Sequence, residues 1–401
     1  MRAVINAPPG YGKSRLIARL AATRRPAVVF VRSHLEGLQM ARYIKEFGRD
    51  AGLLFGRKAL CPFNARDSVE CLKLREHVCK AVSKRPKALV FDIRELYGEG
   101  VCPYEALHVA GRERDVVVLP LAYISKVSNI SAIADLFEAI ELAAVDEVHN
   151  ALSVVKVNDW DFYSRRYCVE DGGALYCLAL PLVGELLKSV RNLVAASASV
   201  LRPFSKIFTY FLNASYVHIG HMPGAENLHV EYIPLEIRYK TRIRREYVER
   251  VVREIQRVYE EYRRVAVFLP NRRLASLYLK KLAGLPVSTQ PLGDLDHVVV
   301  TYYGSPISEG VNLSVRAGVL VGFPFPNVKS RELWLGVKIL RRMGFSGYKY
   351  GVLFAAVNNV VQAVGRVARD LAVEKKYVLL IDDRFWQFRH LLPSYISIEA
   401  V

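Results

Sequence analysis

The sequence has no long apolar segment, and this absence narrows the class of protein. No uncharged run reaches the roughly 18 residues that a membrane-spanning helix needs. One of the longest, GGALYCLALPLVG at 172–184, is expected to cross a protein core instead. The first residues also lack the layout of a secretory signal peptide, because RAVINA (2–7) runs directly into a glycine turn. We therefore expect a cytoplasmic protein with no membrane partner.

Cysteine is scarce, with six residues in 401, which does not indicate a disulfide framework in a cytosolic chain. Cys168 and Cys177 have no motif around them and are predicted to be core residues. The other four fall within 42 residues, with gaps of nine, seven and twenty-two residues between them. No gap is the Cys-x-x-Cys spacing of many metal sites, so a shared metal would depend on tertiary folding. These four candidates are Cys61, Cys71, Cys79 and Cys102.

Acidic residues are too few to balance the basic ones. The chain has 57 Lys and Arg against 39 Asp and Glu, a formal net charge of +18. Such an excess favours a polyanionic partner, with nucleic acid as the leading candidate, over a small acidic metabolite. The alternative is the solvated basic surface of a thermophile protein, since the sequence is also poor in Gln and Met.

Apolar β-branched runs alternate with amphipathic stretches along the chain, which is the βαβ pattern of a buried parallel sheet. The pattern loosens after Pro203 and restarts with the helical spacing of EYVERVVREIQRVYEEYRR (246–264). A chain of 401 residues has room for two such domains. We expect a first α/β domain at 1–205, a connector at 206–228 and a second α/β domain at 229–401.

The segment APPGYGKS (7–14) follows a predicted strand and opens a predicted helix. A small residue, four free positions and Gly-Lys-Ser form the pattern of a phosphate-binding loop, although a plain turn is the alternative. Glycines let backbone amides curl around phosphate, the lysine reaches the β and γ phosphates, and the serine can ligate Mg²⁺. The predicted nucleotide contacts are Pro9, Gly10, Tyr11, Gly12, Lys13 and Ser14.

The segment ELAAVDEVHN (141–150) places two acids directly after a strand. A phosphate-loop protein needs an acid for Mg²⁺ and, for hydrolysis, a second group that aligns or deprotonates water. We therefore predict Asp146 as the magnesium-side acid, Glu147 as general base and His149 as a coupling residue. An Asp-Glu pair that merely ends a strand in solvent is the alternative.

The segment NNVVQAVGRVARD (358–370) places an amide and two guanidinium groups at i, i+4 and i+7: Gln362, Arg366 and Arg369. On one helix these positions share a face, which predicts a grip on the γ-phosphate. An ordinary charged helix face is the alternative.

Taken together, these segments resemble a known family. APPGYGKS, DEVHN, AASAS (195–199), GSPISEGVNLS (304–314) and QAVGRVAR (362–369) occur in the order of superfamily 2 helicase motifs I, II, III, V and VI. The details resemble the XPD branch, the iron-sulfur DNA helicases that include the bacterial DinG relatives. VVFVRSHLEGLQ resembles motif Ia of that branch, and GRKALC and VCPYEAL resemble the flanks of its first and last cluster cysteines.

The resemblance implies two RecA-like domains that bind ATP and Mg²⁺ between them and move 5′ to 3′ on single-stranded or forked DNA. It implies a 4Fe-4S cluster on the four clustered cysteines, in an insertion at 57–108, and a role in DNA repair for a monomer. It assigns Glu309 and Gly310 to the motif that couples ATP to DNA. The candidate DNA contacts, some from this resemblance and some from aromatic rings beside basic residues, are Arg32, His34, Arg66, Tyr104 and Tyr123.

The spacing of two cysteines constrains such a cluster. On one straight helix the Cα atoms of Cys71 and Cys79 would lie about 12 Å apart, which is long for ligands of one cluster. We therefore expect a helix break, or a cysteine beyond the helix end. A zinc site and unliganded core cysteines are the alternatives.

Three departures from the family weaken the prediction of unwinding. Only six residues precede APPGYGKS, where relatives carry a glutamine that reads adenine, so adenine selectivity is in doubt. Residues 151–194 are too few for the family's large Arch domain, so an Arch here is vestigial. AASAS replaces the usual Ser-Ala-Thr or Ser-Gly-Thr. The main alternative function is a DNA-binding paralogue with weak or no ATPase activity that does not unwind DNA. A small-molecule kinase is disfavoured, because it needs neither motifs V and VI nor four clustered cysteines.

Overall fold

The computed structural model describes residues 1–65, 68–81, 97–125, 139–157, 165–305, 307, 313–369 and 371–398. The chain forms two compact units, and short segments of the N-terminal half group with the second. Of the helices within the described ranges, none has both the length and the apolar character of a membrane span. Unit 1 comprises Met1–Val4, Gly12–Ala196 and Phe208–Tyr216, and unit 2 comprises Ile5–Tyr11, Ser197–Ile207 and Val217–Val401.

The first sheet has seven strands in the order β10-β1-β9-β5-β2-β4-β3. Strand β2 pairs in parallel with β4 and β5, and β5 pairs in parallel with β9. Every residue of β2, β4 and β5 is buried, as expected for near-continuous apolar strands covered on both faces. The strands are β1 (Arg2–Asn6), β2 (Ala27–Val31), β3 (Gly52–Leu53), β4 (Val116–Pro120), β5 (Leu142–Asp146), β9 (Asn192–Ser197) and β10 (Ser215–His218).

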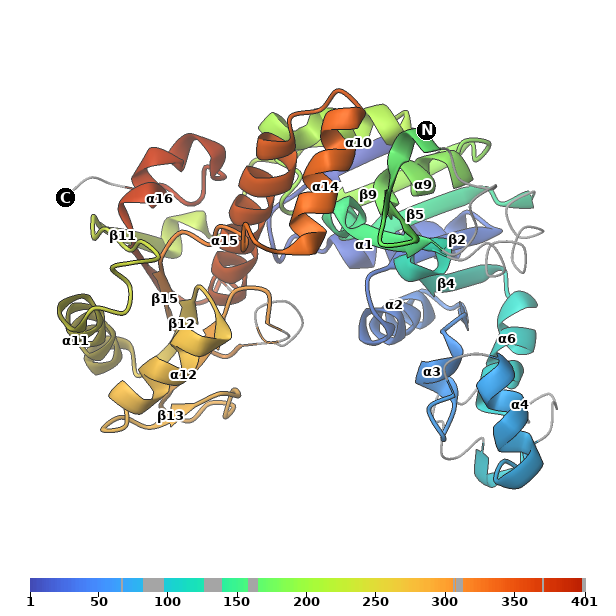
Figure 1. Cartoon of the computed structure of the whole chain (residues 1–401), viewed down its shortest axis with the longest axis horizontal. Helices are drawn as coiled ribbons and strands as arrows, with labels where there is room; N and C mark the ends of the chain where they lie inside the picture. The colour runs from blue at the N-terminus through green and yellow to red at the C-terminus, as the bar shows by residue number, and fades with distance from the viewer. Residues whose placement is uncertain are drawn as a thin grey trace. The chain divides into compact units, whose positions relative to one another are not determined.

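The helices of this part of the chain include three that carry or adjoin the clustered cysteines. Figure 1 shows α3, α4 and α6 close together beyond β4. The helices are α1 (Lys13–Thr23), α2 (His34–Glu46), α3 (Arg57–Leu60), α4 (Ser68–His77), α6 (Pro103–Arg112), α9 (Ala179–Leu186) and α10 (Ser205–Leu212).

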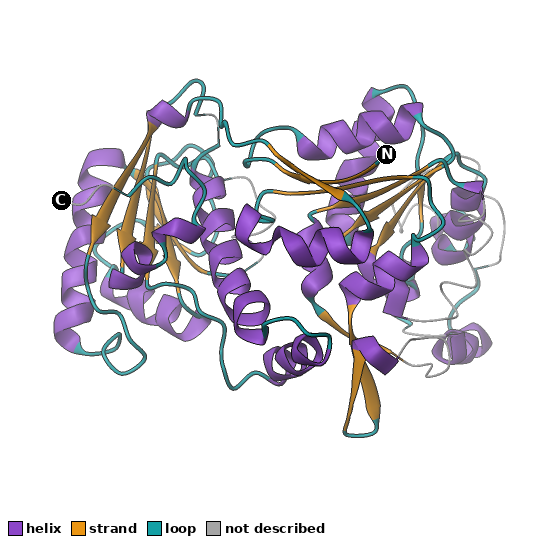
Figure 2. Ribbon diagram, turned by 90° about the horizontal axis from the view of Figure 1, so that it is seen from above, coloured by secondary structure: helices purple, strands orange, loops and turns teal. Residues whose placement is uncertain are grey.

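The second sheet has six strands in the order β11-β16-β15-β12-β14-β13, and every neighbouring pair is parallel. Figure 2 shows the twisted strands of each sheet with helices on their faces. The predicted fold class, two parallel-sheet α/β domains, is confirmed. The strands are β11 (Leu228–Ile233), β12 (Arg264–Leu269), β13 (Val287–Ser288), β14 (His297–Tyr302), β15 (Ala317–Val321) and β16 (Lys376–Ile381).

The longest helix beside the second sheet shows why this sequence forms an α/β layer. Helix α11 buries Val251, Ile255 and Val258, which recur at helical spacing, in the same core as strand residues such as Val267. This confirms the helix predicted at 246–264. The helices here are α11 (Arg245–Tyr262), α12 (Arg272–Lys281), α14 (Arg331–Arg342), α15 (Phe354–Val367) and α16 (Asp383–Gln387).

The region predicted to hold a vestigial Arch contains a small antiparallel sheet in the order β6-β8-β7. The segment predicted to cross a core at 172–184 instead contributes both a strand, β8, and most of helix α9. The bounds of the three strands are β6 (Val154–Val157), β7 (Cys168–Asp171) and β8 (Ala174–Leu178).

A disulfide joins Cys168 to Cys177, so the prediction of two unlinked core cysteines was wrong, although both side chains are buried. Gly172 and Gly173 have positive φ values of 56° and 70° and make the two-residue turn between β7 and β8. This turn fixes a register in which Cys168 lies directly opposite Cys177, with a Cα–Cα distance of 4.0 Å. The signal was therefore present in the sequence, as two cysteines equidistant from a Gly-Gly pair.

The packing of α6 on the edge strand β3 predicts the effect of one substitution. A Cβ atom at Gly52 would lie 2.1 Å from the backbone oxygen of Gly111 in α6, and backbone cannot rotate away. We expect Gly52→Ala to lower the free energy of unfolding by about 2 to 3 kcal/mol, the upper range for overpacking. Urea unfolding followed by circular dichroism measures this change.

Gly56→Ala is the matched control, because a Cβ there meets nothing within 4 Å and its φ is −64°. Equal stability of the two variants would contradict the packing of α6 on β3.

Candidate nucleotide-binding site

The predicted phosphate loop has the backbone that its glycines allow. Gly10 and Gly12 have φ values of 78° and 82°, in the left-handed region that disfavours residues with a Cβ. The Tyr11 amide donates a hydrogen bond to the Pro8 carbonyl, and Gly12 is the N-cap of α1. The loop therefore leads directly into a helix N-terminus, where backbone amides and the helix dipole favour an anion.

Two oxygen atoms from distant parts of the sequence meet in unit 1. Ser14 Oγ, in the first turn of α1, donates a 2.7 Å hydrogen bond to Asp146 Oδ2 at the end of β5. A serine hydroxyl and a carboxylate are hard oxygen donors, the kind that Mg²⁺ prefers. The donor set of Ser14 and Asp146 therefore fits the ion that the sequence pattern implies.

Burial sets the charge balance at this position. Lys13 and Asp146 are only 8% and 7% exposed. Burial and the neighbouring charge of Glu147 raise the pKa of Asp146 to about 7. Burial also lowers the pKa of Lys13, although Glu147 and Asp146 both act in the opposite direction. The two acids and the lysine thus share one desolvated region, where a bound cation would relieve the repulsion between the carboxylates.

Glu147 follows the strand in a strained conformation, with φ at 47° and ψ at 52°. Left-handed backbone is uncommon for a residue other than glycine and is often found at functional sites. The Glu147 amide donates to Asp146 Oδ1 at 3.1 Å. His149 Nδ1 lies 3.1 Å from Glu147 Oε2, and this contact holds the carboxylate in place. The backbone turn therefore points two consecutive acids to different tasks.

A further carboxylate, Glu36 of α2, escaped the sequence analysis. Arg32 lies beside it, with its Nε 3.2 Å from Glu36 Oε1 and its amide donating to Glu36 Oε2 at 3.0 Å. Burial raises the pKa of Glu36, and the charges of Glu147 and His149 also act on it. The spacing of an arginine and a glutamate at i and i+4 was the available signal. Arg32 therefore belongs to a charge network that extends to Glu147.

The third predicted segment is only partly helical as expected. Helix α15 ends at Val367, and the Ala368 amide closes it by donating to the Val364 carbonyl. The placement of Arg369 at position i+7 of one helical face was therefore wrong, because Arg369 lies in the turn beyond the helix. Gln362 and Arg366 do lie on α15, and Arg366 is buried.

A close approach within unit 2 brings α15 next to the start of the phosphate loop. A Cβ atom at Gly365 would lie 2.5 Å from Pro9 Cγ, so only glycine fits there. Arg366 is the next residue in the helix. The roles of Gln362, Arg366 and Arg369 toward a phosphate remain predictions.

The four clustered cysteines do not form a metal site in the described part of the chain. No three His, Cys, Asp or Glu side chains gather there in a way that could hold a metal ion. Arg57 Nη1 donates to Cys71 Sγ at 3.1 Å, and the charge of Cys71 and a hydrogen bond with Cys102 act on Arg75. Nearby guanidinium groups favour the thiolate, the form that binds metal.

The predicted relation between two of these cysteines is confirmed. Helix α4 ends at His77, and Cys79 lies beyond its end, where its amide donates to the Leu74 carbonyl.

The candidate DNA contacts lie in different surroundings. Tyr104 stacks under the Arg57 guanidinium at 4.0 Å, an arrangement that leaves basic and aromatic groups together. Tyr123 is 5% exposed, and its hydroxyl lies 2.8 Å from His108 Nε2, which favours a packing role. The His34 ring lies 4.6 Å from the ring of Phe55. The remaining candidates, Arg66, Glu309 and Gly310, lie outside the described residues.

The buried acid predicts an unusual effect of pH on stability. The folded protein favours protonated Asp146, so its contribution to stability falls as pH rises from about 4 through about 7. Asp146→Asn keeps an oxygen that can accept from Ser14 and removes the buried charge. Without Mg²⁺ or nucleotide we expect this variant to unfold with about 1 to 3 kcal/mol more free energy than wild type at pH 8, with roughly 4 kcal/mol as the upper bound.

Urea unfolding at pH 8 and pH 5 checks this, because the gain should shrink toward zero at the lower pH. The exposed Asp296→Asn is the control and should change stability little at either pH. A loss of stability at pH 8 would contradict the electrostatic account.

Comparison with known proteins places this geometry in a fold. Residues 293–397 match the family model described as Helicase C-terminal domain. Comparison with curated proteins gives no match. A solved XPD helicase aligns at 14% identity, with a TM-score of 0.70, over 100% of this chain and 96% of that chain. Xpd4 of S. tokodaii aligns at 13% identity, with a TM-score of 0.61, over 100% and 96%.

An RNA-bound structure shares the fold more distantly. S. cerevisiae Dbp5, bound to RNA and ADP BeF3, aligns at 12% identity with a TM-score of 0.51, over 100% of this chain and 85% of that chain. Residues 293–397 thus form a helicase C-terminal domain, and the resemblance of this chain to XPD-type superfamily 2 helicases is confirmed at the level of the fold.

Proposed function

We propose that the protein is an ATP-dependent DNA helicase or translocase of the XPD type, which moves 5′ to 3′ on single-stranded DNA. The observation that carries the proposal is the 2.7 Å hydrogen bond between Ser14 and Asp146. It joins the phosphate loop to the strand end that bears Glu147, so that the groups for phosphate, Mg²⁺ and water belong to one site in unit 1. The helicase C-terminal match and the XPD-like fold support the same reading.

Each residue has a distinct task in this proposal. Lys13 and the loop amides bind the β and γ phosphates, and Ser14 and Asp146 hold Mg²⁺, which would neutralise phosphate charge. Glu147 accepts a proton from the attacking water, and His149 keeps the Glu147 carboxylate oriented. Gln362, Arg366 and Arg369 stabilise the charge that develops on the γ-phosphate.

Electrostatics favours DNA as the polyanion on which the protein acts. The net charge of +18 attracts a phosphate backbone, and one structural relative is bound to RNA. Arg32 could respond to such a backbone, because its present partner is Glu36, whose carboxylate interacts electrostatically with Glu147 and His149. DNA contact at Arg32 would then reach the hydrolytic acid through two side chains.

A 4Fe-4S cluster on Cys61, Cys71, Cys79 and Cys102 forms part of the proposal. Cys71 and Cys102 both interact with Arg75, which places them in one small region beside a positive charge. The cluster would hold α4 and α6 together, as a structural brace for the cysteine-bearing region.

Two substitutions separate nucleotide binding from hydrolysis. Lys13→Ala should lose ATP affinity, because it removes the phosphate contact. Glu147→Gln should bind ATP normally but hydrolyse it about 10²- to 10⁴-fold more slowly, the usual contribution of a general base. ATP binding and phosphate release in the presence of single-stranded DNA give the two quantities.

Glu185→Gln, an exposed substitution in α9, serves as the control for loss of a carboxylate. Undiminished turnover in Glu147→Gln would sink the proposal that this residue activates water. DNA binding without any wild-type turnover would favour the non-unwinding paralogue instead.

The cluster proposal makes a prediction independent of activity. Protein purified without oxygen should carry about four iron atoms per chain. Cys71→Ser should lose most of the iron, whereas Cys177→Ser should retain it, because Cys177 pairs with Cys168. Iron and zinc analysis of the purified chains checks this. Zinc in place of iron, or neither metal in wild type, would contradict the cluster.

A further inference from the structure

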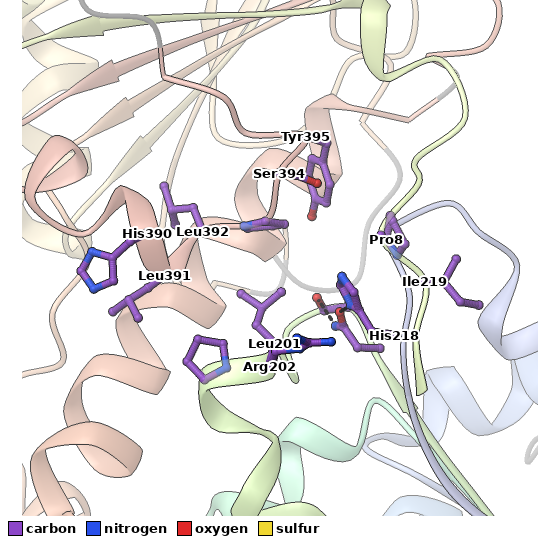
Figure 3. Close-up of a pocket in the computed structure, with 15 residues that line it drawn as sticks. Pro8, Leu201, Arg202, His218, Ile219, His390, Leu391, Leu392, Ser394 and Tyr395 are labelled. Atoms are coloured by element: carbon purple, nitrogen blue, oxygen red, sulfur yellow. Dashed lines mark hydrogen bonds between the residues drawn. The ribbon is translucent and has the colours of Figure 1, made fainter. Parts of the chain in front are cut away.

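A cavity of about 160 Å³ lies within unit 2, beside the first residues of the phosphate loop. Figure 3 shows it enclosed by side chains from separate segments, among them Pro8, Leu201, His218, Leu391 and Tyr395. Its volume is below the roughly 300 to 1,000 Å³ of pockets that enclose drug-sized ligands. The cavity therefore suits a single ring system rather than a whole nucleotide.

One buried polar group faces this cavity without a partner. Tyr395 is 8% exposed, and its hydroxyl makes no hydrogen bond in the described part of the chain. In Figure 3 the hydroxyl end of the ring points toward the side where His218 and Arg202 lie. An unpartnered buried hydroxyl costs about 1 to 3 kcal/mol, so its presence at a cavity wall calls for a ligand.

The opposite wall is held by a fixed hydrogen-bond network. The Asn6 amide nitrogen donates to the carbonyls of Ser197 and Ala198, at 3.2 Å and 2.9 Å. The Asn6 Oδ1 atom must therefore accept from His218 Nδ1, 2.9 Å away, and this bond sets both the tautomer and the orientation of the ring. The site is thus rigid before any ligand arrives.

We propose that this cavity receives the nucleobase of ATP, with the Tyr395 hydroxyl as a hydrogen-bonding group to the edge of the base. This inference rests on the proposed function. Pro8 lies in the segment that continues through Gly10 and Gly12 to Lys13, so a ligand whose phosphates bind the loop has its other end available to the cavity. Flat apolar surfaces from prolines and leucines, with few polar groups, match the usual composition of a base site.

The test compares a ligand that has a base with one that has none. ADP and pyrophosphate, each with Mg²⁺, would be titrated into wild type and Tyr395→Phe by calorimetry. We expect Tyr395→Phe to weaken ADP binding about three- to tenfold, the loss of one neutral hydrogen bond, and to leave pyrophosphate binding unchanged. The melting temperature of the ligand-free variant should not fall, because the hydroxyl that it lacks has no partner.

Tyr303→Phe is the matched control, because Tyr303 is also buried but its hydroxyl donates to the Gly322 carbonyl at 3.3 Å. That variant should lose stability and keep the ratio of ADP to pyrophosphate affinity.

The outcomes separate this inference from the proposed function. If ADP and pyrophosphate both bind in a manner that depends on Lys13, but Tyr395→Phe changes neither, the base lies elsewhere and the proposed function stands. If Tyr395→Phe weakens both ligands equally, the hydroxyl does not read the base and the inference fails. If neither ligand binds wild type, the nucleotide site and the inference fail together.

Discussion

The hydrogen bond between Ser14 and Asp146 is the constraint on which the site depends. It requires the end of β5 and the start of α1 to meet at the carboxyl edge of one parallel sheet, where ligands of open α/β folds bind. The meeting point is dry, so a carboxyl group there is costly to ionise, and its pKa rises to about 7. Lys13 offsets part of this cost, and a bound cation would offset more.

The same constraint accounts for the shape of the chain around it. Glu147 adopts left-handed backbone because the chain must turn at the strand end while the Asp146 carboxyl stays next to Ser14. Fully buried neighbouring strands hold the edge in place, which gives the strained turn a rigid support. Arg32 and Glu36 then extend the charge network away from the acids toward the start of α2. Stability and function therefore oppose each other at one position, Asp146.

The sequence predicted those features that local pattern controls. Apolar runs identified the buried strands, and the glycine spacing identified the loop at residues 7–14, because Gly10 and Gly12 need positive φ values. It predicted less well what depends on where elements end and on long-range packing. The periodicity of α15 runs on through Arg369, but the helix stops at Val367.

Groups that meet only in three dimensions were harder to find. Nothing local to Tyr395 or Glu36 indicates that one faces a cavity and the other interacts with Glu147. The disulfide of Cys168 and Cys177 is intermediate between these cases, because the Gly-Gly turn that sets its register is visible in the sequence.

The central claim, that this chain converts ATP hydrolysis into movement on DNA, is tested most directly by unwinding of forked duplexes that carry a single-stranded tail at either the 5′ or the 3′ end. The account predicts ATP-dependent strand separation of the 5′-tailed substrate and little of the 3′-tailed one. Tight binding of both substrates, with no strand separation and no acceleration of ATP hydrolysis by DNA, would contradict it.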